Sequence, residues 1–252
     1  MKILSVINQK GGVGKTTTCI NVGADLADRG YKVLLIDLDA QGNLTSGMGI
    51  PIEDDTPTVY EVLKGVCDIN KAIVECGDSL WILPADIRLS GADMELSGVP
   101  GRDSILKEAI SQLNIKFDYI IIDCAPSLGI IPLMALTAAD GIIIPVQAQY
   151  PPLKGLSQLT NTIDLVKKRM NPSLDIIGVL LTMYNHRRIL DRKILNNIQQ
   201  AFPDQLFKTT ISTNIALAEA PSCGVDIHTY NPDSMGSEQY TALTDEILER
   251  MN

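Results

Sequence analysis

Aromatic residues, paired cysteines and long apolar runs are all scarce in this 252-residue chain. Aromatics make up 4% of the residues, whereas hydrophobic residues make up 45%, so the core must be aliphatic, as in parallel sheets covered by helices. The five cysteines are scattered and include no CxxC pair, which argues against a disulfide framework and against a zinc or iron–sulfur site. No apolar stretch approaches the roughly 20 residues of a membrane span, and no charged-then-apolar leader precedes Lys2. We therefore expect reduced thiols and a cytoplasmic protein.

An excess of basic residues is also missing. Lys and Arg number 21 against 30 Asp and Glu, which gives a net charge of -9. The average field of such a chain does not attract nucleic acid, so any DNA contact needs a local basic patch. Residues 50–58 hold two prolines and three consecutive acids, and this composition predicts a surface loop.

Short, almost wholly apolar runs alternate along the chain with longer helical patterns. Such runs are typical of strands buried on both faces, and they cover residues 3–7, 33–36, 80–83, 119–122, 141–146 and 176–181. The helical patterns cover residues 15–29, 102–113, 153–170 and 188–202. Alternating strands and helices imply right-handed crossovers and a mostly parallel sheet. We predict one α/β domain over residues 1–252, with three α-β-α layers and ligands at the carboxyl ends of the strands.

A glycine-rich segment directly follows the first predicted strand and opens the first helix. It reads Lys10-Gly11-Gly12-Val13-Gly14-Lys15-Thr16-Thr17. Glycines there let backbone N–H groups surround phosphate oxygens, Lys15 can reach the β- and γ-phosphates, and the Thr16 hydroxyl can ligate Mg²⁺. The alternatives are a glycine-rich turn with a solvated lysine, or a dinucleotide-binding loop. Thr17 in the place of the third glycine argues against the dinucleotide loop, so we predict that this segment binds ATP and Mg²⁺.

Acidic residues follow two of the predicted strands. Strand alternation places Asp37 and Asp39 on one side, where two carboxylates could face a metal and a water, although either could instead cap the following turn. Four apolar residues precede Asp123, and a carboxylate is costly at the end of a buried strand unless it serves a cation. We therefore expect Asp123 to hold Mg²⁺ through a water, with Thr16 and Asp37 as the other metal-site candidates.

These motifs together resemble the ParA/Soj family of P-loop ATPases. Residues 10–16 match the deviant Walker A motif KGGxGK[ST], residues 37–43 resemble the A′ motif DxDPQGN, and further matches extend to Glu219-Ala220-Pro221-Ser222. The resemblance implies a P-loop NTPase fold and an ATP-dependent sandwich homodimer in which Lys10 reaches the partner's phosphates. It implies that Asp39 orients the attacking water, that Asp37 lies nearer the metal, and that Lys10 and Lys15 stabilise charge.

The resemblance also implies a biological role. Family members move or position DNA and other cargo, which implies slow intrinsic hydrolysis, a ParB-like or other basic-segment activator, nonspecific DNA binding on the nucleoid, and chromosome or plasmid segregation. Because the chain starts at the first strand, it resembles the short form of the family, without the operator-reading extension. The acidic stretch at residues 237–252 has a single base and argues against the membrane-bound relatives.

DNA contacts depend on which basic residues are present. Ser212, Thr213 and Ala216 stand where many relatives carry a proline and two arginines, whereas residues 167–208 carry eight basic and three acidic side chains. The candidate DNA-binding residues are Arg187, Arg188, Arg192 and Lys193, which could neutralise phosphates without reading sequence. A solvated helix with Arg187 paired to Asp191 is the alternative. Two other functions stay open, namely positioning of a protein cargo and an ATP-dependent carrier or ligase that does not use DNA.

Overall fold

A computed structural model describes residues 1–148 and 152–251 and shows an eight-stranded sheet in the order β3-β4-β2-β5-β1-β6-β7-β8. Every neighbouring pair is parallel except β3 and β4, which run antiparallel. The strands are β1 (Lys2–Val6), β2 (Val33–Leu38), β3 (Val74–Gly77), β4 (Leu80–Leu83), β5 (Tyr119–Cys124), β6 (Gly141–Gln147), β7 (Asp175–Tyr184) and β8 (Leu206–Ser212).

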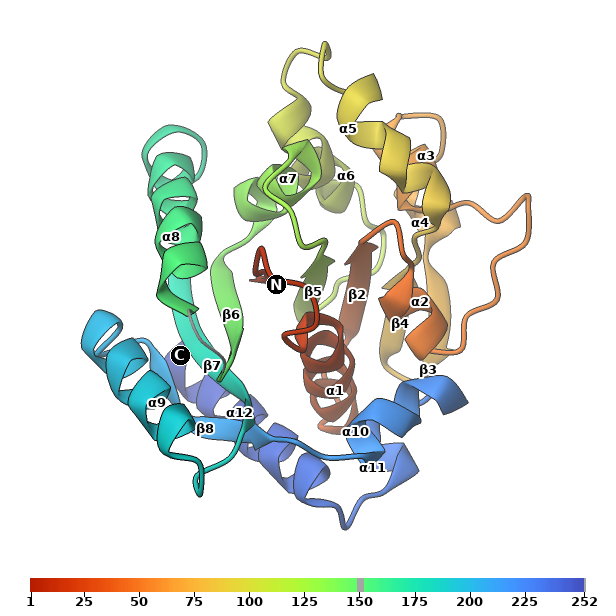
Figure 1. Ribbon diagram of the computed structural model, residues 1–252. Coiled ribbons are helices and arrows are strands. Elements are labelled where there is room, and N and C mark those ends of the chain that lie inside the picture. The colour runs from red at the N-terminus through yellow and green to blue at the C-terminus, as the bar shows by residue number, and fades with distance from the viewer. Residues whose placement is uncertain (149–151, 252) are drawn as a thin grey trace.

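Helices cover both faces of this sheet, as Figure 1 shows. The α-helices are α1 (Lys15–Asp28), α2 (Asn43–Gly47), α3 (Val59–Leu63), α4 (Ile69–Ala72), α5 (Ala92–Glu95), α6 (Ile105–Ser111), α7 (Ile130–Ala138), α8 (Pro152–Arg169), α9 (Ile189–Ala201), α10 (Ala216–Glu219), α11 (Ile227–Tyr230) and α12 (Met235–Met251). Three 3-10 turns complete the order, η1 (Ile87–Gly91), η2 (Arg102–Ser104) and η3 (Ala220–Cys223).

The core divides into two apolar clusters, one on each face of the sheet. Along β2, Leu34 and Ile36 pack into the cluster that includes α6, α7, α8 and α9, whereas Val33 and Leu35 pack into the cluster that includes α1 and α12. All four side chains are fully buried. This alternation is what a strand covered on both faces requires, so the predicted three-layer α/β fold with a mostly parallel sheet is confirmed.

The predicted elements correspond to six of the eight strands and to helices α1, α6, α8 and α9. All six predicted strands are present, and no regular element lies within residues 50–58, as expected of a surface loop. The helix predicted at residues 102–113 begins as the turn η2 and continues as the shorter α6. Two strands were not predicted, because β3 alternates between half-buried and exposed residues and β8 carries the polar run Lys208-Thr209-Thr210.

The last helix is packed on the domain. Tyr240, Leu243 and Ile247 of α12 are each at most 1% exposed and lie in the cluster beneath α1. Arg250 donates to the carbonyl oxygens of Ile177, Gln205 and Leu206 at 2.8–2.9 Å, which ties the end of α12 to β7 and β8. Within residues 1–148 and 152–251, no helix has both the length and the hydropathy of a membrane span.

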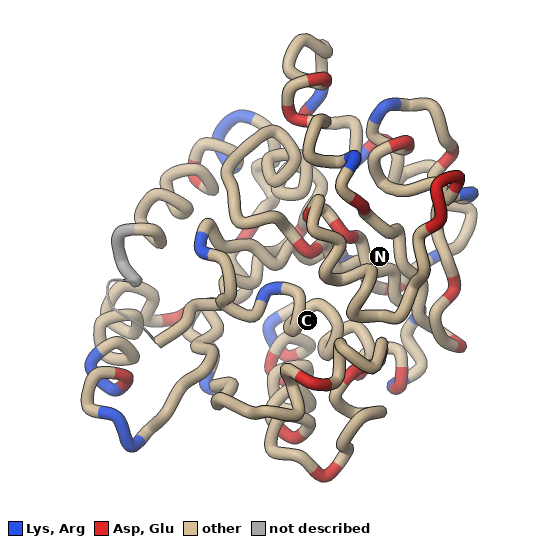
Figure 2. Tube along the Cα trace, turned by 45° about the vertical axis from the view of Figure 1, so that its right-hand side comes forward, with Lys and Arg blue, Asp and Glu red and all other residues tan. Residues whose placement is uncertain are grey.

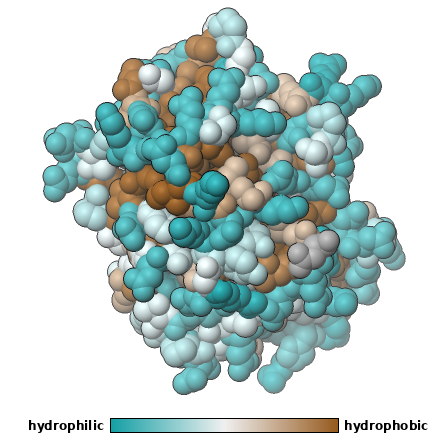
Figure 3. All heavy atoms as spheres, turned by 180° about the vertical axis from the view of Figure 1, so that it is seen from behind, coloured by the Kyte–Doolittle hydropathy of each residue, from teal (hydrophilic) through white to brown (hydrophobic). Residues whose placement is uncertain are grey.

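Charge and hydropathy are unevenly distributed over the surface. Figure 2 shows basic residues along the loop before α9 and along that helix at the lower left, while acidic residues predominate on the right. Seen from behind, the molecule is mostly hydrophilic, with apolar side chains gathered in its upper half (Figure 3). The chain therefore carries a local basic area although its net charge is -9.

Candidate nucleotide site

The glycine-rich segment forms the turn between β1 and α1, at the carboxyl edge of the sheet. Gly14 caps α1 with φ +87°, a left-handed conformation that favours glycine. Residues of other strands also fix the turn, because the Thr182 hydroxyl donates to the Val13 carbonyl at 2.8 Å. The Asn8 amide likewise donates to the Pro145 carbonyl at 2.7 Å and accepts the Lys10 N–H at 3.0 Å. The loop is therefore positioned by strands β6 and β7 as well as by its own glycines.

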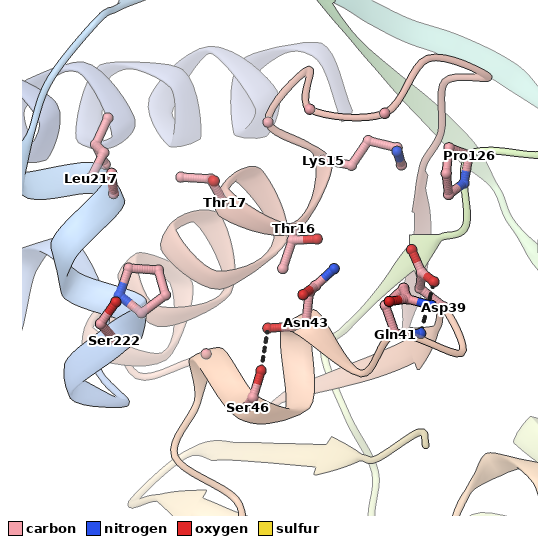
Figure 4. A pocket seen from close by; sticks show the side chains of 16 residues that line it. Lys15, Thr16, Thr17, Asp39, Gln41, Asn43, Ser46, Pro126, Leu217 and Ser222 are labelled. Atoms are coloured by element: carbon pink, nitrogen blue, oxygen red, sulfur yellow. Dashed lines mark hydrogen bonds between the residues drawn. The ribbon is translucent and has the colours of Figure 1, made fainter. Parts of the chain in front are cut away.

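A pocket of about 710 Å³ opens beside this loop, within the range of ligand sites. Figure 4 shows three walls around it: the phosphate loop with the start of α1, the segment from Asp39 into α2, and the segment of α10 and η3. The lining residues are Gly11, Gly12, Gly14, Lys15, Thr16, Thr17, Asp39, Gln41, Asn43, Ser46, Gly47, Pro126, Leu217, Ala218, Pro221 and Ser222. Six of the eight predicted loop residues, all except Lys10 and Val13, therefore line this pocket.

Lys15 and Thr16, predicted to bind phosphate and Mg²⁺, both line the pocket. The Lys15 side chain is 7% exposed, and its ammonium donates to the Lys10 carbonyl at 3.4 Å across the turn. The Thr16 hydroxyl donates to Asp123 Oδ2 at 2.6 Å, although the two residues are 107 positions apart. A strand end and a helix start thus bring a hydroxyl, an ammonium and a carboxylate to one edge of the pocket.

Asp123 is a buried acid with one oxygen that makes no hydrogen bond to the described residues. It is 1% exposed, and its Oδ1 has no hydrogen-bond partner among the residues that the structure describes. Burial, and next the nearby Asp37 carboxylate, raise the pKa of Asp123 to about 8. No group of three or more His, Cys, Asp or Glu in the described part of the chain is arranged as a metal cage. These observations fit a Mg²⁺ ion held by one hydroxyl, waters and phosphate oxygens.

Asp37 and Asp39 lie in different environments, although the sequence placed them on one side. Asp37 is fully buried, and its carboxylate accepts the Thr45 N–H at 2.9 Å, the Thr45 hydroxyl at 2.8 Å and the Asp39 N–H at 3.0 Å. Burial raises its pKa to about 6. These bonds fix the turn into α2, which is the capping role that the sequence left open. Asp39 lines the pocket and accepts the Gln41 N–H at 3.0 Å.

Lys10 does not line the pocket beside its own loop. It is exposed, it is not among the described residues that line the pocket, and its ammonium donates to Gln147 Oε1 at 3.2 Å. Val13 is buried under the loop at 1% exposure. Of the predicted nucleotide residues, these are the two that the structure sets apart from the pocket.

Several pocket residues were not predicted as site residues. Asn43, Ser46 and Gly47 come from α2, and Leu217, Ala218, Pro221 and Ser222 come from α10 and η3, more than 200 residues after β1. The sequence held a signal for three of them, because Asn43 ends the A′ motif and Pro221-Ser222 belongs to a matched segment. Only the folded chain brings these segments opposite Thr17.

The predicted DNA-binding residues lie together before and along the first turn of α9. Arg187, Arg188, Arg192 and Lys193 are all exposed. The alternative pairing of Arg187 with Asp191 is not formed, because Asp191 is 2% exposed and accepts the Asn185 N–H at 2.8 Å. Arg192 and Arg187 carry no ion pair within the described part of the chain.

Comparison with known proteins identifies the family. The family described as an AAA domain matches residues 1–176. The chain is 47% identical over 249 residues to the sporulation initiation inhibitor protein Soj of Bacillus subtilis, covering 98% of both chains. It is 43% identical over 250 residues to the chromosome partitioning protein ParA of Myxococcus xanthus, covering 99% of this chain and 88% of that protein. The chain belongs to the ParA/Soj family of P-loop ATPases.

A solved structure supports the same assignment of fold. Cobyrinic acid a,c-diamide synthase from Mycobacterium smegmatis, solved with a bound ATP analogue and magnesium, aligns with a TM-score of 0.88 at 35% identity and covers 100% of this chain and 96% of that one. The predicted family and P-loop fold are therefore confirmed. The ligands of that protein are also the two cofactors predicted from the sequence of this ParA/Soj member.

Proposed function

We propose that this chain is an ATP-switched partition ATPase that binds Mg²⁺-ATP, closes into a sandwich dimer, holds DNA nonspecifically and releases it on hydrolysis. The single observation that carries the proposal is the pairing of Thr16 with the buried, half-partnered Asp123 beside Lys15. This arrangement needs a divalent cation and phosphate to be electrostatically complete. Family membership supplies the partition role.

Nucleotide binding uses the three walls of the pocket. Gly11, Gly12 and Gly14 would present backbone N–H groups to phosphate oxygens, Lys15 would neutralise the phosphate charge, and the Thr16 hydroxyl and Asp123 would hold Mg²⁺. When bound, Mg²⁺ offsets the charge that develops on the phosphate oxygens. The base would lie on the far side of Thr17, against the apolar surface of Leu217 and Pro221.

Hydrolysis needs a water in line with the γ-phosphate. Asp39 is the pocket carboxylate available to orient that water, because Asp37 is fully used by the turn into α2. The Asp39 carboxylate accepts only the Gln41 N–H among the described residues, and a single fixed bond leaves the position of the carboxylate loosely defined. Hydrolysis by the isolated protein should therefore be slow, and a ParB-like activator with a basic segment would complete the site.

Dimer closure depends on Lys10. Its ammonium is exposed and lies outside its own pocket, so a phosphate supplied by a second copy is the ligand that it can reach without entering the loop. ATP would then be both substrate and the contact that holds the dimer together. Such a dimer would carry two copies of the basic residues at the start of α9. Twice as many positive charges would strengthen contacts with the DNA phosphate backbone.

The decisive experiment measures binding of nonspecific duplex DNA with ATP, with ADP and without nucleotide, at two salt concentrations. The test variant is Arg187→Glu/Arg188→Glu, and the matched control is Lys107→Glu/Lys116→Glu, an equal charge change at exposed lysines near the amino ends of the strands. We expect salt-sensitive binding with ATP alone, lost in the test variant and retained in the control. Equal loss in both variants would indicate a net-charge effect only.

Absence of DNA binding in every nucleotide state would contradict the DNA part of this proposal. Positioning of a protein cargo, or a carrier or ligase reaction, would then remain. The ligase alternative predicts that ATP turnover rises with a small-molecule acceptor and is indifferent to DNA and to a ParB-like protein. Turnover measured with each of these additions therefore separates the functions.

A further inference from the structure

Gln147, the last residue of β6, bridges the phosphate loop and the end of β7. Its Oε1 accepts the Lys10 ammonium at 3.2 Å, and its Nε2 donates to Met183 Sδ at 3.0 Å. The main chains are joined at the same level, because the Ala148 N–H donates to the Thr182 carbonyl. One amide side chain thus contacts both Lys10 and the strand end that leads toward α9.

Met183 has an unusual backbone conformation. Its φ is +51°, which makes it the one non-glycine residue with positive φ among those described. The left-handed region is unfavourable for a side chain with a Cβ, and such conformations persist only where surrounding contacts hold them. The β7–β8 register also shifts between Leu181 and Tyr184, as at a β-bulge, a feature that is frequent beside functional sites.

The loop that follows Met183 is a compact unit attached to α9. Asn185 N–H donates to the buried Asp191 carboxylate at 2.8 Å, and Asn185 Oδ1 accepts the Arg187 N–H at 3.0 Å. Arg192 donates to the His186 carbonyl at 2.8 Å. Residues 185–188 and the first turn of α9 should therefore move together. The backbone would bend at Met183, where β7 leads into this loop.

We propose that Gln147 and Met183 are positioning residues that couple the place of Lys10 to the orientation of the arginine loop at residues 185–188. This proposal rests on the proposed function, since it assumes that Lys10 moves when ATP is bound. While Lys10 is bonded to Gln147, the amide stays in the orientation that also holds Met183. When Lys10 leaves for a phosphate, the amide loses that restraint, and Met183 and the loop can adopt a second arrangement.

The coupling requires both ends of the Gln147 amide. Loss of the Lys10 contact removes one hydrogen bond of the Gln147 amide. The remaining contact with Met183 Sδ and the unfavourable φ of Met183 then determine which of two loop arrangements is more stable. A small energetic change at a residue held in a strained conformation is sufficient to shift such a balance. The arginine loop would thereby respond to nucleotide although it lies outside the pocket.

The test is amide hydrogen exchange of residues 184–188 with Mg²⁺-AMPPNP and with Mg²⁺-ADP. Gln147→Leu removes both contacts, and Gln147→Glu keeps an acceptor for Lys10 but loses the donor to Met183. Gln112→Leu, at an exposed glutamine that follows α6, is the matched control. We expect a nucleotide-dependent exchange difference in the wild type and in the control, and its loss in both Gln147 variants. Protection of residues 11–17 by AMPPNP should persist in all four proteins.

Lys10→Ala should also abolish the difference, and adding Gln147→Leu to it should change nothing further, because the two residues act in series. An unchanged exchange pattern at residues 184–188 in the wild type, or a full difference in either Gln147 variant, would overturn the coupling. DNA binding measured on the same samples decides the proposed function separately. Loss of DNA binding with a normal exchange response would contradict that function and leave the coupling supported.

Discussion

The Thr16 hydroxyl donates to Asp123 Oδ2 at 2.6 Å, while Asp123 Oδ1 lies buried without a partner among the described residues. This pair, at which we propose that Mg²⁺ binds, is therefore assembled before a ligand arrives, and one oxygen of the buried Asp123 makes no hydrogen bond to the described residues. Burying a charge without a counter-charge is costly. The nucleotide-free protein should be destabilised at this point, and Mg²⁺-ATP should relieve that cost.

This imbalance predicts a pH dependence of stability. The pKa of Asp123 is raised to about 8 by burial and by Asp37, so the folded state holds a proton that the unfolded state loses near pH 4. The free energy of unfolding of the nucleotide-free protein should fall as pH rises from about 4 to 8, by roughly 1.4 kcal/mol per pH unit where one proton separates the states. Urea unfolding at pH 6, 7 and 8 measures this slope.

Asp123→Asn is the matched test of that slope. The neutral side chain removes the titration, so this contribution between pH 6 and 8 should disappear and the nucleotide-free variant should be more stable than the wild type at pH 8. The same variant should gain little thermal stability from Mg²⁺-ATP. An unchanged slope would show that the pH dependence originates elsewhere.

A close backbone contact between two glycines predicts that the pocket walls support each other. A Cβ on Gly224 would lie 2.8 Å from the Cα of Gly49, and the φ of Gly224 is +72°. Gly224→Ala should therefore destabilise the protein by about 1–3 kcal/mol and weaken ATP binding, because η3 lines the pocket. Gly65→Ala is the control, since its φ is +70° but nothing lies within 4 Å of its Cβ. Equal ATP affinity in both variants would contradict this explanation.

Substitution of Arg250, which lies far from the pocket, should strongly lower the free energy of unfolding. Removing its guanidinium in Arg250→Ala leaves three backbone carbonyls, in and next to β7 and β8, and Glu246 without this donor. The cost should be about 2–4 kcal/mol. Arg29→Ala is the comparison, because Arg29 pairs with Asp25 and with the exposed Asp245 and should cost about 1 kcal/mol or less. Chemical denaturation of both variants gives the difference, and equal losses would refute it.

Asp39→Ala should separate binding from hydrolysis. The side chain lines the pocket but is not bonded to Lys15 or Thr16, so ATP should bind with similar affinity while turnover falls by about 10²-fold or more. Binding of a fluorescent ATP analogue and phosphate release, measured side by side, test this. Asn43→Ala, on the same wall, is the control for general damage to the pocket.

Sequence reasoning located the fold and the phosphate loop because both depend on local signals. The buried strands of a parallel sheet are continuous apolar runs, and the loop chemistry lies within eight residues. It could not distinguish the environments of Asp37 and Asp39, because the hydrogen-bond partner of Asp37 is Thr45, which lies on a helix of only five residues. It also gave no role to Leu217 or Gln147, since Leu217 shares the pocket with a phosphate loop at the other end of the chain and Gln147 bonds to Lys10, 137 positions earlier.

The most direct test of the ATP switch is the mass of the Asp39→Ala protein in solution, measured by sedimentation with Mg²⁺-ATP, with Mg²⁺-ADP and without nucleotide. We predict that the Asp39→Ala protein is a dimer with Mg²⁺-ATP and a monomer in the other two states. The double variant Asp39→Ala/Lys10→Ala should be a monomer in all three states, although it still binds ATP. A Lys10→Ala protein that still dimerises with ATP, or an Asp39→Ala protein that stays monomeric while saturated with ATP, would contradict the sandwich dimer.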